Sequence, residues 1–397
     1  MKKLIFYLLI FFAFAKLDAQ WVQVWNGMGQ TRTVTTTCWN NNQLVAGAVT
    51  FYNGHGIYIS TNEGLTWSLT SLNNKDVWDL IYSTSNYIAS TENGIYISND
   101  GNTWTNFALS GKEVYETAVN NNYMFAGLRD NGVYYSTNNG AVWTQSFLNN
   151  KSIWSLAVYN NNVIAGTYSN GIYYSNDNGY VWYQSNLPSI TVERIKFDGT
   201  IAYAGTENGI YKSTNFGVNW VQFGLSGKSI NDFVFNGQYI YAATDNNGIY
   251  VSTKQGLTWN LINEGFPAGN FTANSLTFTN NYLITGLSYK SVWRRFRSEV
   301  DVKRISKIVP SCFILSQNYP NPFNPTTTIK FDIPKSDNVK ILIFDVLGKE
   351  VALLLNEKLS PGSYSVDWNA LDYPSGVYFY RMQTENFTET KQMILLK

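Results

Sequence analysis

The sequence contains little charge, a single histidine and only two cysteines. Charged residues make up 14% of the 397 positions, and 28 Lys+Arg against 27 Asp+Glu leave a formal net charge of +1. Such a chain offers no basic field to a polyanion, which argues against nucleic-acid binding. With His55 alone, HExxH zinc sites, two-histidine metal clamps and most multi-histidine acid–base schemes are excluded. Cys38 and Cys312 can form neither a disulfide framework nor a zinc finger.

Cofactor chemistry is also poorly provided for. No glycine-rich phosphate loop opens a helix and no thiolate pair is present, so we expect no cofactor and no transition metal. Calcium stays open, because its oxygen ligands can come from Asp, Asn and backbone carbonyls. The chain has instead 16% aromatic residues, including 13 Trp, together with many Asn, Gly, Thr and Tyr. This composition is typical of an exported all-β protein.

The first nineteen residues are typical of a signal peptide. Met1-Lys2-Lys3 supplies a positive start, and Leu4 to Ala15 is a run of twelve apolar residues. Such a run spans only about 18 Å as a helix, short of the ~30 Å hydrocarbon core, so a membrane anchor is disfavoured. We expect cleavage between Ala19 and Gln20, and no later stretch is apolar enough to span a membrane.

A unit of 38 or 39 residues recurs along residues 21–297. Each copy has a strand of small residues, then Gly-aliphatic-Tyr, then a Trp, and the small-residue strand recurs a seventh time at Ile284–Leu287. Four short alternating strands in about 40 residues are typical of a β-propeller blade, and a strand-only solenoid is the alternative. We therefore predict an all-β chain with a seven-bladed propeller at 20–297. The repeated glycines and tryptophans are Gly56, Gly94, Gly132, Gly171, Gly209 and Gly248, and Trp67, Trp104, Trp143, Trp182, Trp220 and Trp259.

The seventh unit lacks a fourth strand of its own. It stops near Ser291–Arg295, whereas Trp21–Trp25 resembles a fourth strand such as Trp67–Thr70. Because an open sheet edge is a liability, we predict that Trp21–Trp25 completes the last blade and buries both of its indoles.

The turn between the third and fourth strands has a recurring sequence, which reads STNEGLTW at Ser60–Trp67. It resembles the Asp-box, S-x-D-x-G-x-x-W, of sialidase, sortilin-type and photosystem assembly-factor propellers. The Asp is kept at Asp100 and Asp177 and is replaced by Asn, or by Lys254, in the other copies. In those families the turn is structural, so the resemblance implies a fold and no activity. The further full-length copies are Ser136–Trp143, Ser175–Trp182, Ser213–Trp220 and Ser252–Trp259.

The sequence changes character after residues 298–312, which we expect to be a linker. Residues 313–397 contain YPNPFNPTTTI at Tyr319–Ile329 and then alternating runs, which predict a small Ig-like β-sandwich. The segment resembles the C-terminal sorting domain of the type IX secretion pathway through YPNPFNPTTTI and three later motifs, Asp345–Gly348, Ser375–Tyr378 and Lys391–Lys397. The resemblance implies Sec export, recognition by the type IX machinery and a secreted or outer-membrane surface location. An ordinary carbohydrate-binding or Ig-like sandwich is the alternative.

One face of the predicted propeller collects the candidate binding residues, opposite the Asp-box turns. Aligned repeats place cations before the inner strand, a mixed polar ring four residues later, and aromatics one residue before that ring. We expect the cations to rim the channel mouth and to favour an anionic ligand, with the aromatics for stacking. Surface ion pairs and blade packing are the structural alternatives. The cations are Arg32, Lys75, Lys112, Lys151 and Lys228, the ring is Thr36, Asp79, Glu116, Ser155, Arg194, Asp232 and Ser275, and the aromatics are Trp78, Tyr115 and Trp154.

The first repeat has a loop on this face that is five residues longer than its counterpart between Gly205 and Gly209. It contains Phe51, Tyr52 and His55, and an insertion with aromatics at its tip is a reasonable ligand contact. A role in the turn itself is the alternative for His55.

Hydrolase chemistry has candidate residues on the same face. A sialidase-like carboxylate clamp would use Arg32, Arg129 and Arg194 with the adjoining Tyr115-Glu116, although no Arg-Ile-Pro motif is present. A xyloglucanase-like site would use Asp79 and Asp232, whose separation decides between retaining and inverting chemistry.

The sequence as a whole favours a non-catalytic propeller that binds an extracellular glycan or peptide. A glycoside hydrolase is the first alternative, and a purely structural surface scaffold is the second.

Overall fold

The structure is a computed structural model, and it describes residues 20–49, 55–187, 189–237, 239–253, 256, 258–296, 303–306, 309–359, 361–370 and 373–396. Its contacts divide the chain into two compact units, Trp21–Arg297 and a second unit that contains Ser298–Lys397. The predicted signal peptide and Ala19 lie outside the described residues, as do Phe51 and Tyr52. The described residues form strands, turns and loops, and among them no helix has the length and apolar character needed to cross a membrane.

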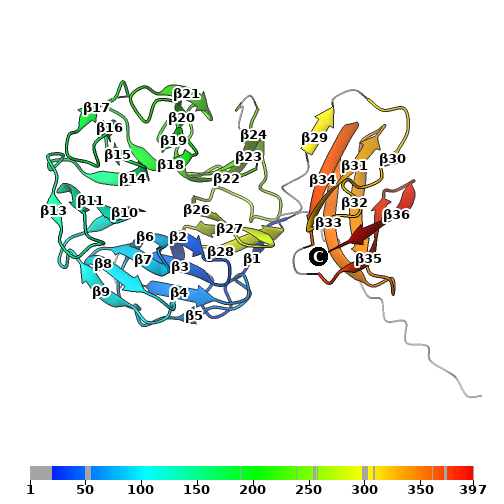
Figure 1. Cartoon of the computed structure of the whole chain (residues 1–397), viewed down its shortest axis with the longest axis horizontal. Helices are drawn as coiled ribbons and strands as arrows, with labels where there is room; N and C mark the ends of the chain where they lie inside the picture. Colours follow the sequence, from blue (N-terminus) through cyan, green and yellow to red (C-terminus); the bar gives the residue numbers. More distant parts are fainter. Residues whose placement is uncertain are drawn as a thin grey trace, which may run out of the picture. The chain divides into compact units, whose positions relative to one another are not determined.

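The first unit is a ring of four-stranded antiparallel sheets around a central axis (Figure 1). The innermost strands β2, β6, β10, β14, β18, β22 and β26 follow one another in this order, and β26 lies beside β2. The described residues of this unit form seven such sheets. Six of them are β2–β5 (Thr33–Trp39, Leu44–Val49, Gly56–Ser60, Ser68–Leu69), β6–β9 (Val77–Ser83, Asn86–Thr91, Gly94–Ser98, Thr105–Ala108), β10–β13 (Val114–Asn120, Tyr123–Leu128, Gly132–Ser136, Thr144–Gln145), β14–β17 (Ile153–Tyr159, Asn162–Thr167, Ile172–Ser175, Tyr183–Gln184), β18–β21 (Val192–Asp198, Ile201–Thr206, Gly209–Ser213, Val221–Gly224) and β22–β25 (Ile230–Asn236, Tyr239–Thr244, Gly248–Thr253, Asn260–Leu261).

The last sheet contains both ends of the propeller. It consists of β26 (Ala273–Phe278), β27 (Tyr282–Leu287), β28 (Ser291–Phe296) and β1 (Val22–Gln23), and β1 pairs antiparallel with β28. Trp21 is 2% exposed, stacks on Phe266 at 4.9 Å and donates its indole N–H to Ile262 O at 2.6 Å. The predicted closing segment is therefore in place, but the expectation of two buried indoles is wrong. Trp25 is 42% exposed, because the strand ends at Gln23 and Trp25 begins a turn, its carbonyl accepting from Met28 N at 2.8 Å.

The small residues of the second strands permit neighbouring sheets to approach closely. A Cβ on Gly47 would lie 2.7 Å from Val77 Cγ1, and a Cβ on Gly127 would lie 2.6 Å from Ile153 Cγ2. The same contact closes the ring, since a Cβ on Gly286 would lie 2.6 Å from Val34 Cγ1. These clashes explain why small residues recur in the second strands: neighbouring sheets pack so closely that a larger side chain does not fit between them.

The Asp-box-like turns are organised by hydrogen bonds from side chains to backbone. In the first sheet Ser60 Oγ accepts from Gly64 N at 2.9 Å, and Asn62 Oδ1 accepts from Thr66 N at 2.9 Å. In the second sheet the backbone N–H groups of Thr103 and Asn102 lower the pKa of Asp100 to about 2. The turn therefore stabilises its own loop, as expected for a structural motif.

Each innermost strand has a β-bulge at the same place. The pairing with the second strand slips by one residue just before the polar-ring position, as between Val77 and Asp79 or between Val192 and Arg194. The extra residue is left out of the ladder and its side chain is redirected. We call these seven the bulge residues: Thr35, Trp78, Tyr115, Trp154, Glu193, Asn231 and Asn274.

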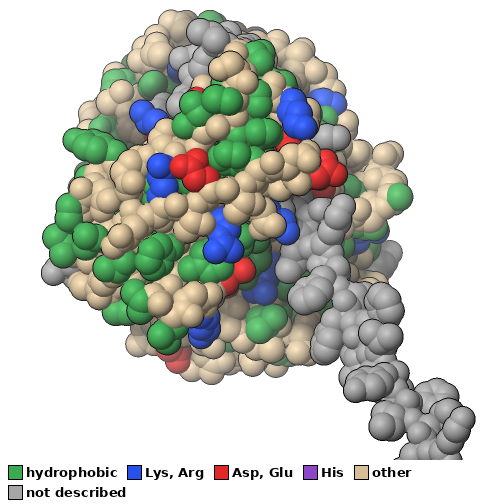
Figure 2. Space-filling view, turned by 90° about the vertical axis from the view of Figure 1, so that its right-hand side faces the viewer, with side chains coloured by type: hydrophobic (Ala, Val, Ile, Leu, Met, Phe, Trp, Pro, Cys, Tyr) green, Lys and Arg blue, Asp and Glu red, His purple; other side chains and the backbone are tan. Residues whose placement is uncertain are grey.

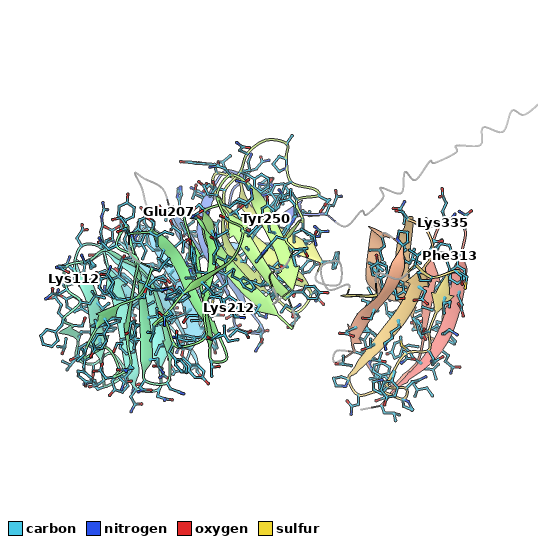
Figure 3. The ribbon with its side chains drawn as sticks, turned by 90° about the horizontal axis from the view of Figure 1, so that it is seen from above. Lys112, Glu207, Lys212, Tyr250, Phe313 and Lys335 are labelled. Carbon is cyan, nitrogen blue, oxygen red and sulfur yellow. The ribbon has the colours of Figure 1, made fainter. Side chains whose placement is uncertain are left out.

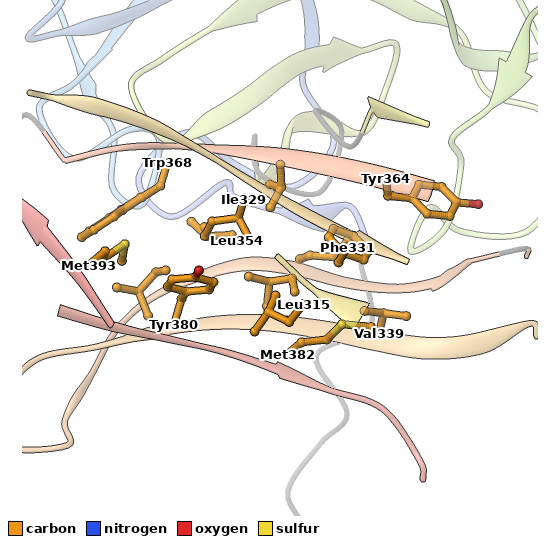
Figure 4. Packing of buried hydrophobic residues seen from close by; sticks show 14 of the residues in the cluster. Leu315, Ile329, Phe331, Val339, Leu354, Tyr364, Trp368, Tyr380, Met382 and Met393 are labelled. Carbon is orange, nitrogen blue, oxygen red and sulfur yellow. The ribbon is translucent and has the colours of Figure 1, made fainter. Parts of the chain in front are cut away.

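The second unit is a sandwich of two four-stranded sheets. One has the order β29-β34-β31-β30 and the other β33-β32-β35-β36. Figure 4 shows their facing side chains, among them Phe331, Trp368, Tyr380 and Met393, packed into one core. The strands are β29 (Lys303–Ser306), β30 (Ile314–Leu315), β31 (Thr326–Ile333), β32 (Asp337–Phe344), β33 (Glu350–Leu359), β34 (Gly362–Asn369), β35 (Gly376–Gln383) and β36 (Thr388–Leu395).

The proline-rich motif of the second unit is part of its core. Phe323 is 2% exposed and packs on Trp368 with ring centroids 5.5 Å apart. Asn318 is also buried, and its side-chain amide donates to Pro320 O at 3.1 Å and Thr327 Oγ1 at 2.9 Å. A buried amide must be hydrogen-bonded, so this network holds the irregular segment in one conformation.

We predict that Trp21 carries most of the energy of closure. Trp21→Ala should lower the free energy of unfolding by ~3–5 kcal/mol, because it leaves a large cavity and removes a buried hydrogen bond. Trp25→Ala, the control, should change it by less than ~0.5 kcal/mol, because its indole is exposed. Chemical denaturation of the full chain measures both. Equal losses for the two variants would contradict this account of closure.

Candidate functional site

The bulge residues surround a cavity of about 410 Å³ on the axis of the propeller. All seven line it, one from each sheet, together with Arg194, Asp245 and Thr272. Asp245 follows β23 and Thr272 precedes β26, so the cavity belongs to the face formed by the loops before the inner strands. This is the face on which the sequence analysis placed the ligand, opposite the Asp-box-like turns.

Three aromatic bulge residues form one side of the cavity, which we call the aromatic wall: Trp78, Tyr115 and Trp154. The rings of Trp78 and Tyr115 meet edge to face at 5.6 Å and 77°, and those of Tyr115 and Trp154 at 5.9 Å and 72°. Tyr168 stacks behind Trp154 at 4.9 Å. The three aromatics predicted from the sequence are thus brought together around the cavity.

The other side of the cavity is polar, and three of its bulge residues join neighbouring sheets. Thr35 Oγ1 donates to Val77 O at 2.5 Å, and Asn231 and Asn274 donate to Ala273 O and Val34 O, each at 2.9 Å. Each bond runs from a bulge residue to the carbonyl that precedes the bulge in the next sheet. Side chains that can donate are therefore useful at this position for structure alone.

Glu193 departs from that pattern. An ionised carboxylate has no proton to donate, and its side chain makes no hydrogen bond or ion pair within the described part of the chain. Burial raises the pKa of Glu193 to about 7; Arg194 opposes this effect, and Glu207 and Asp245 add to it. Glu207 lies in the turn after β19 and is labelled in Figure 3. Asp245 accepts a hydrogen bond from Thr272 Oγ1 at 2.6 Å.

Arg194 closes the axis below the cavity. Its Nη1 lies 3.1 Å from Asp79 Oδ1 and 2.8 Å from Glu116 Oε1, and its Nε lies 3.8 Å from Asp232 Oδ1. Lys196 Nζ lies 2.6 Å from the same Asp232 oxygen. We call these five residues the charged cluster. It joins the second, third, fifth and sixth sheets across the ring.

Burial decides the direction of the pKa shift of two carboxyls in the charged cluster. It raises the pKa of Asp79 although Arg194 and Lys196 oppose it, and it raises the pKa of Glu116 to about 7 against the opposing effect of Arg194. The second oxygens are used structurally. Glu116 Oε2 accepts from Leu156 N at 2.9 Å, and Asp232 Oδ2 accepts from Leu276 N at 2.7 Å.

The same bond recurs at other positions of the predicted polar ring. Thr36 Oγ1 accepts from Leu80 N at 3.2 Å, and Ser155 Oγ accepts from Ile195 N at 2.7 Å. The ring residue of one sheet thus binds the backbone of the next sheet. Of the seven ring residues, Arg194 alone is among the residues that line the cavity.

The five predicted cations do not line the cavity. Lys112 lies 5.2 Å above the Tyr134 ring and Lys228 lies 5.3 Å above the Tyr250 ring, and Lys112 and Tyr250 are labelled in Figure 3. Lys75 lies 3.9 Å from Glu92, in line with the structural alternative of weak surface pairs. The backbone carbonyl of Lys151 accepts from Gly132 N at 2.9 Å. A role in binding stays a prediction for these residues. Figure 2 draws the right-hand side of the view in Figure 1, where basic and acidic side chains are interspersed.

His55 is held against Arg32. Arg32 Nη1 lies 2.6 Å from His55 Nδ1, and Arg32 Nε donates to Met28 O at 3.0 Å. Burial lowers the pKa of His55, and the positive charge of Arg32 lowers it further, so the imidazole is neutral at pH 7 and accepts a hydrogen bond.

Of the hydrolase candidates, only Tyr115 and Arg194 line the cavity. Asp79 and Asp232 are 5% and 4% exposed and both face Arg194 in the charged cluster. Arg129 pairs instead with Glu113 at 3.3 Å on the surface. Within the described residues, no group of three or more His, Cys, Asp or Glu is placed to hold a metal ion.

Glu193 and Asp245 were not predicted from the sequence as site residues. Glu193 occupies the same aligned position as the aromatic wall, so reading that position in all seven repeats would have found it. Asp245 lies in a loop, and only its hydrogen bond to Thr272 and the ring geometry bring it to the cavity.

The comparison with protein families identifies the C-terminal part of the chain. Residues 317–396 match the family described as the secretion system C-terminal sorting domain. This match confirms the predicted sorting domain and the predicted destination, which is the cell surface or the medium by type IX export. The type IX machinery is therefore a partner of this segment. A search of curated proteins finds no match.

Solved structures of similar fold include YCF48 from Cyanidioschyzon merolae, with 15% identity and a TM-score of 0.54 over 70% of this chain and 99% of that chain. YCF48 bound to D1 peptide gives 14% identity, a TM-score of 0.54, and coverage of 71% and 96%. PorZ is described as an essential bacterial surface component of the type IX secretion system of Porphyromonas gingivalis. It is 16% identical with a TM-score of 0.54, over 91% of this chain and 59% of that chain. These likenesses show the fold and confirm the predicted all-β propeller.

We predict that Arg194 is required for stability as well as for the shape of the cavity. Arg194→Met should cost ~3–5 kcal/mol of unfolding free energy, because it leaves three buried carboxylates without their shared cation. Lys75→Met, which removes a surface pair, should cost at most ~1 kcal/mol. Urea titrations of the two full-length variants measure the difference, and a loss no larger for Arg194→Met than for Lys75→Met would contradict the prediction.

We predict that Glu193 lowers the free energy of unfolding at high pH but not at low pH. Because its folded pKa is raised from 4.5 to about 7, its stabilising contribution is full below pH 4.5 and is lost as the pH rises through 7. Glu193→Gln should therefore match the wild type at pH 4 and melt a few degrees higher at pH 8, at roughly 2–4 °C per kcal/mol. Asp130→Asn, at an exposed carboxylate, is the control. Melting curves that coincide at pH 8 would show that Glu193 costs nothing.

Proposed function

We propose that the propeller is a non-catalytic binding module, delivered to the cell surface or the medium by its sorting domain, and that it takes an extracellular glycan or peptide into the central cavity. One observation carries the proposal. In three sheets the bulge residue is Thr35, Asn231 or Asn274, and its side chain joins neighbouring sheets by a hydrogen bond. In the second, third and fourth sheets the same position holds an aromatic ring, and the three rings adjoin one another beside the cavity. Aromatic rings beside a concave site supply large contact area at low cost in conformational entropy.

The fold of this propeller is compatible with peptide binding. YCF48, a propeller of similar fold, is described as bound to D1 peptide. PorZ, also of similar fold, is described as a surface component of the type IX system. These likenesses support a surface binding role as a proposal, and the ligand is argued from the cavity.

A glycoside hydrolase remains the second candidate, on different residues from those expected. Glu193 and Asp245 line one cavity, and a carboxyl with a pKa of about 7 beside a second carboxyl is the pattern of a general acid and its partner. We favour binding, because the charged cluster occupies the carboxylates that the sequence had suggested for catalysis.

Glycan-array and peptide-array binding of the full mature chain tests the proposed function. A Trp78→Ala/Trp154→Ala double variant should lose at least about ten-fold of the wild-type signal, since central aromatic residues dominate binding energy. Tyr183→Ala, at an exposed ring on β17, is the control and should bind normally. A Lys75→Ala/Lys112→Ala/Lys151→Ala variant tests the predicted rim.

The outcomes separate the candidates. Binding that is lost in the double variant supports the cavity, and cleavage of a bound glycan that stops in Glu193→Gln would instead establish the hydrolase. Binding that persists in the double variant, or that is absent from both arrays, would overturn the proposal in favour of a rim site or a surface scaffold.

A further inference from the structure

We propose that the group entering the cavity is the cationic side chain of a peptide, a Lys ammonium or an Arg guanidinium, held between the aromatic wall and the carboxylates of Glu193 and Asp245. This inference rests on the proposed function and names its ligand class.

The cavity has a net negative charge, because the one cation among its described lining residues is already paired with carboxylates outside it. Arg194 is its one cationic lining residue among those described, and its charge faces Asp79, Glu116 and Asp232 in the charged cluster. Glu193 has no partner among the described residues, and Asp245 is bonded to a neutral hydroxyl. Two acidic groups thus face the cavity without a cation of their own, which favours a positively charged ligand.

The aromatic wall suits a compact cation better than a flat sugar ring. Its successive rings meet edge to face at 77° and 72°, so they present alternating edges and faces rather than one broad platform. A cation near such rings is attracted by the negative face of each π-system. The charged cluster closes the axis below, so a side chain enters end-on with its apolar stem along the rings.

Within the part of the chain that is described, Glu193 has no structural role of the kind that equivalent residues have, which points to a role in binding. At the equivalent position Thr35, Asn231 and Asn274 donate a hydrogen bond to the next sheet, and a carboxylate cannot do so. A partly buried carboxylate without a partner destabilises the fold once it is ionised, and groups of this kind cluster at functional sites. A bound cation would give Glu193 the partner that it lacks.

The titration of Glu193 gives the inference a second readout. The charged groups around it are Arg194 on the same strand, Glu207 in the turn after β19 and Asp245 after β23. Its pKa of about 7 means that the carboxylate forms between pH 6 and pH 8. A ligand of fixed positive charge should therefore bind more tightly as the pH rises over this range.

Isothermal titration calorimetry of the full mature chain with blocked pentapeptides tests the inference. The probes carry Lys, Arg, trimethyl-Lys or uncharged norleucine at the centre of otherwise identical glycine sequences, and free glucosamine is a fifth probe. We expect the three cationic peptides to bind at least ten-fold more tightly than the norleucine peptide. The trimethyl-Lys peptide should gain about five- to ten-fold in affinity between pH 6 and pH 8.

Two variants and a control assign the effect to the cavity. Glu193→Gln should weaken the cationic peptides at least five-fold at pH 8 and remove most of their pH dependence; the remainder comes from Glu116, whose pKa is also about 7 and which binds Arg194 below the cavity. Asp245→Asn should weaken them at both pH values. Asp130→Asn removes an exposed carboxylate outside the cavity and should change neither. Circular dichroism melts confirm that each variant is folded before titration.

Each outcome bears on one proposal or the other. Equal binding of norleucine and Lys peptides, or tighter binding of glucosamine than of any peptide, would overturn the cationic-peptide inference. An array ligand that needs Trp78 and Trp154, together with no binding of any cationic peptide, would overturn this inference and leave the proposed function standing. Failure of the arrays and of all five probes would overturn both.

Discussion

Close approach between neighbouring inner strands is the constraint on which the rest of the propeller depends. A side chain at Gly47, Gly127 or Gly286 would overlap Val77, Ile153 or Val34 at the start of the next inner strand, so these second strands must have small residues there. Once the strands are this close, a short side chain can reach the next backbone. The bonds from Thr36, Glu116, Ser155 and Asp232 to the next sheet exist because of that proximity.

The β-bulge divides the inner strand between two tasks. In four sheets the residue after the bulge accepts a hydrogen bond from the neighbouring sheet. The bulge residue itself is released from the ladder and lines the cavity, where three of the seven also donate to the next sheet. A change at the bulge position therefore alters the cavity without breaking a ladder bond. This arrangement lets one repeated backbone carry Thr, Trp, Tyr, Glu and Asn at equivalent places, which is how a site can vary on a constant fold.

Much of the fold could be predicted because it is written in short-range patterns. The Gly-Ile-Tyr strand starts, the small-residue strands and the Trp of each turn recur at a fixed spacing, and the structure shows why each is needed. The strand Glu350–Leu359 was not predicted, since its run of Val, Ala and Leu does not alternate. The exposure of Trp25 was also missed, because where a strand ends is decided by its partner strand.

The site was only half predictable, for a physical reason. Trp78, Tyr115 and Trp154 stand out in an alignment of repeats because large aromatic rings are conspicuous at one position. The pairing of Arg194 with Asp79 and Glu116 joins residues 115 and 78 positions apart, and no local pattern announces it. The predicted cations were placed correctly before the inner strands, but the direction of a long side chain depends on neighbours such as Tyr134 and Tyr250.

The pairing of β1 with β28 has a mechanical consequence. The chain leaves the propeller from Phe296, at the end of β28, and β28 lies between β27 and β1 in one sheet. A tension applied to the chain beyond Phe296 is transmitted to the propeller through β28, which is hydrogen-bonded along both edges. To pull this strand out, the bonds to β27 and the bonds to β1 must both break, so the N-terminal strand anchors the point at which the C-terminal side of the propeller would be loaded.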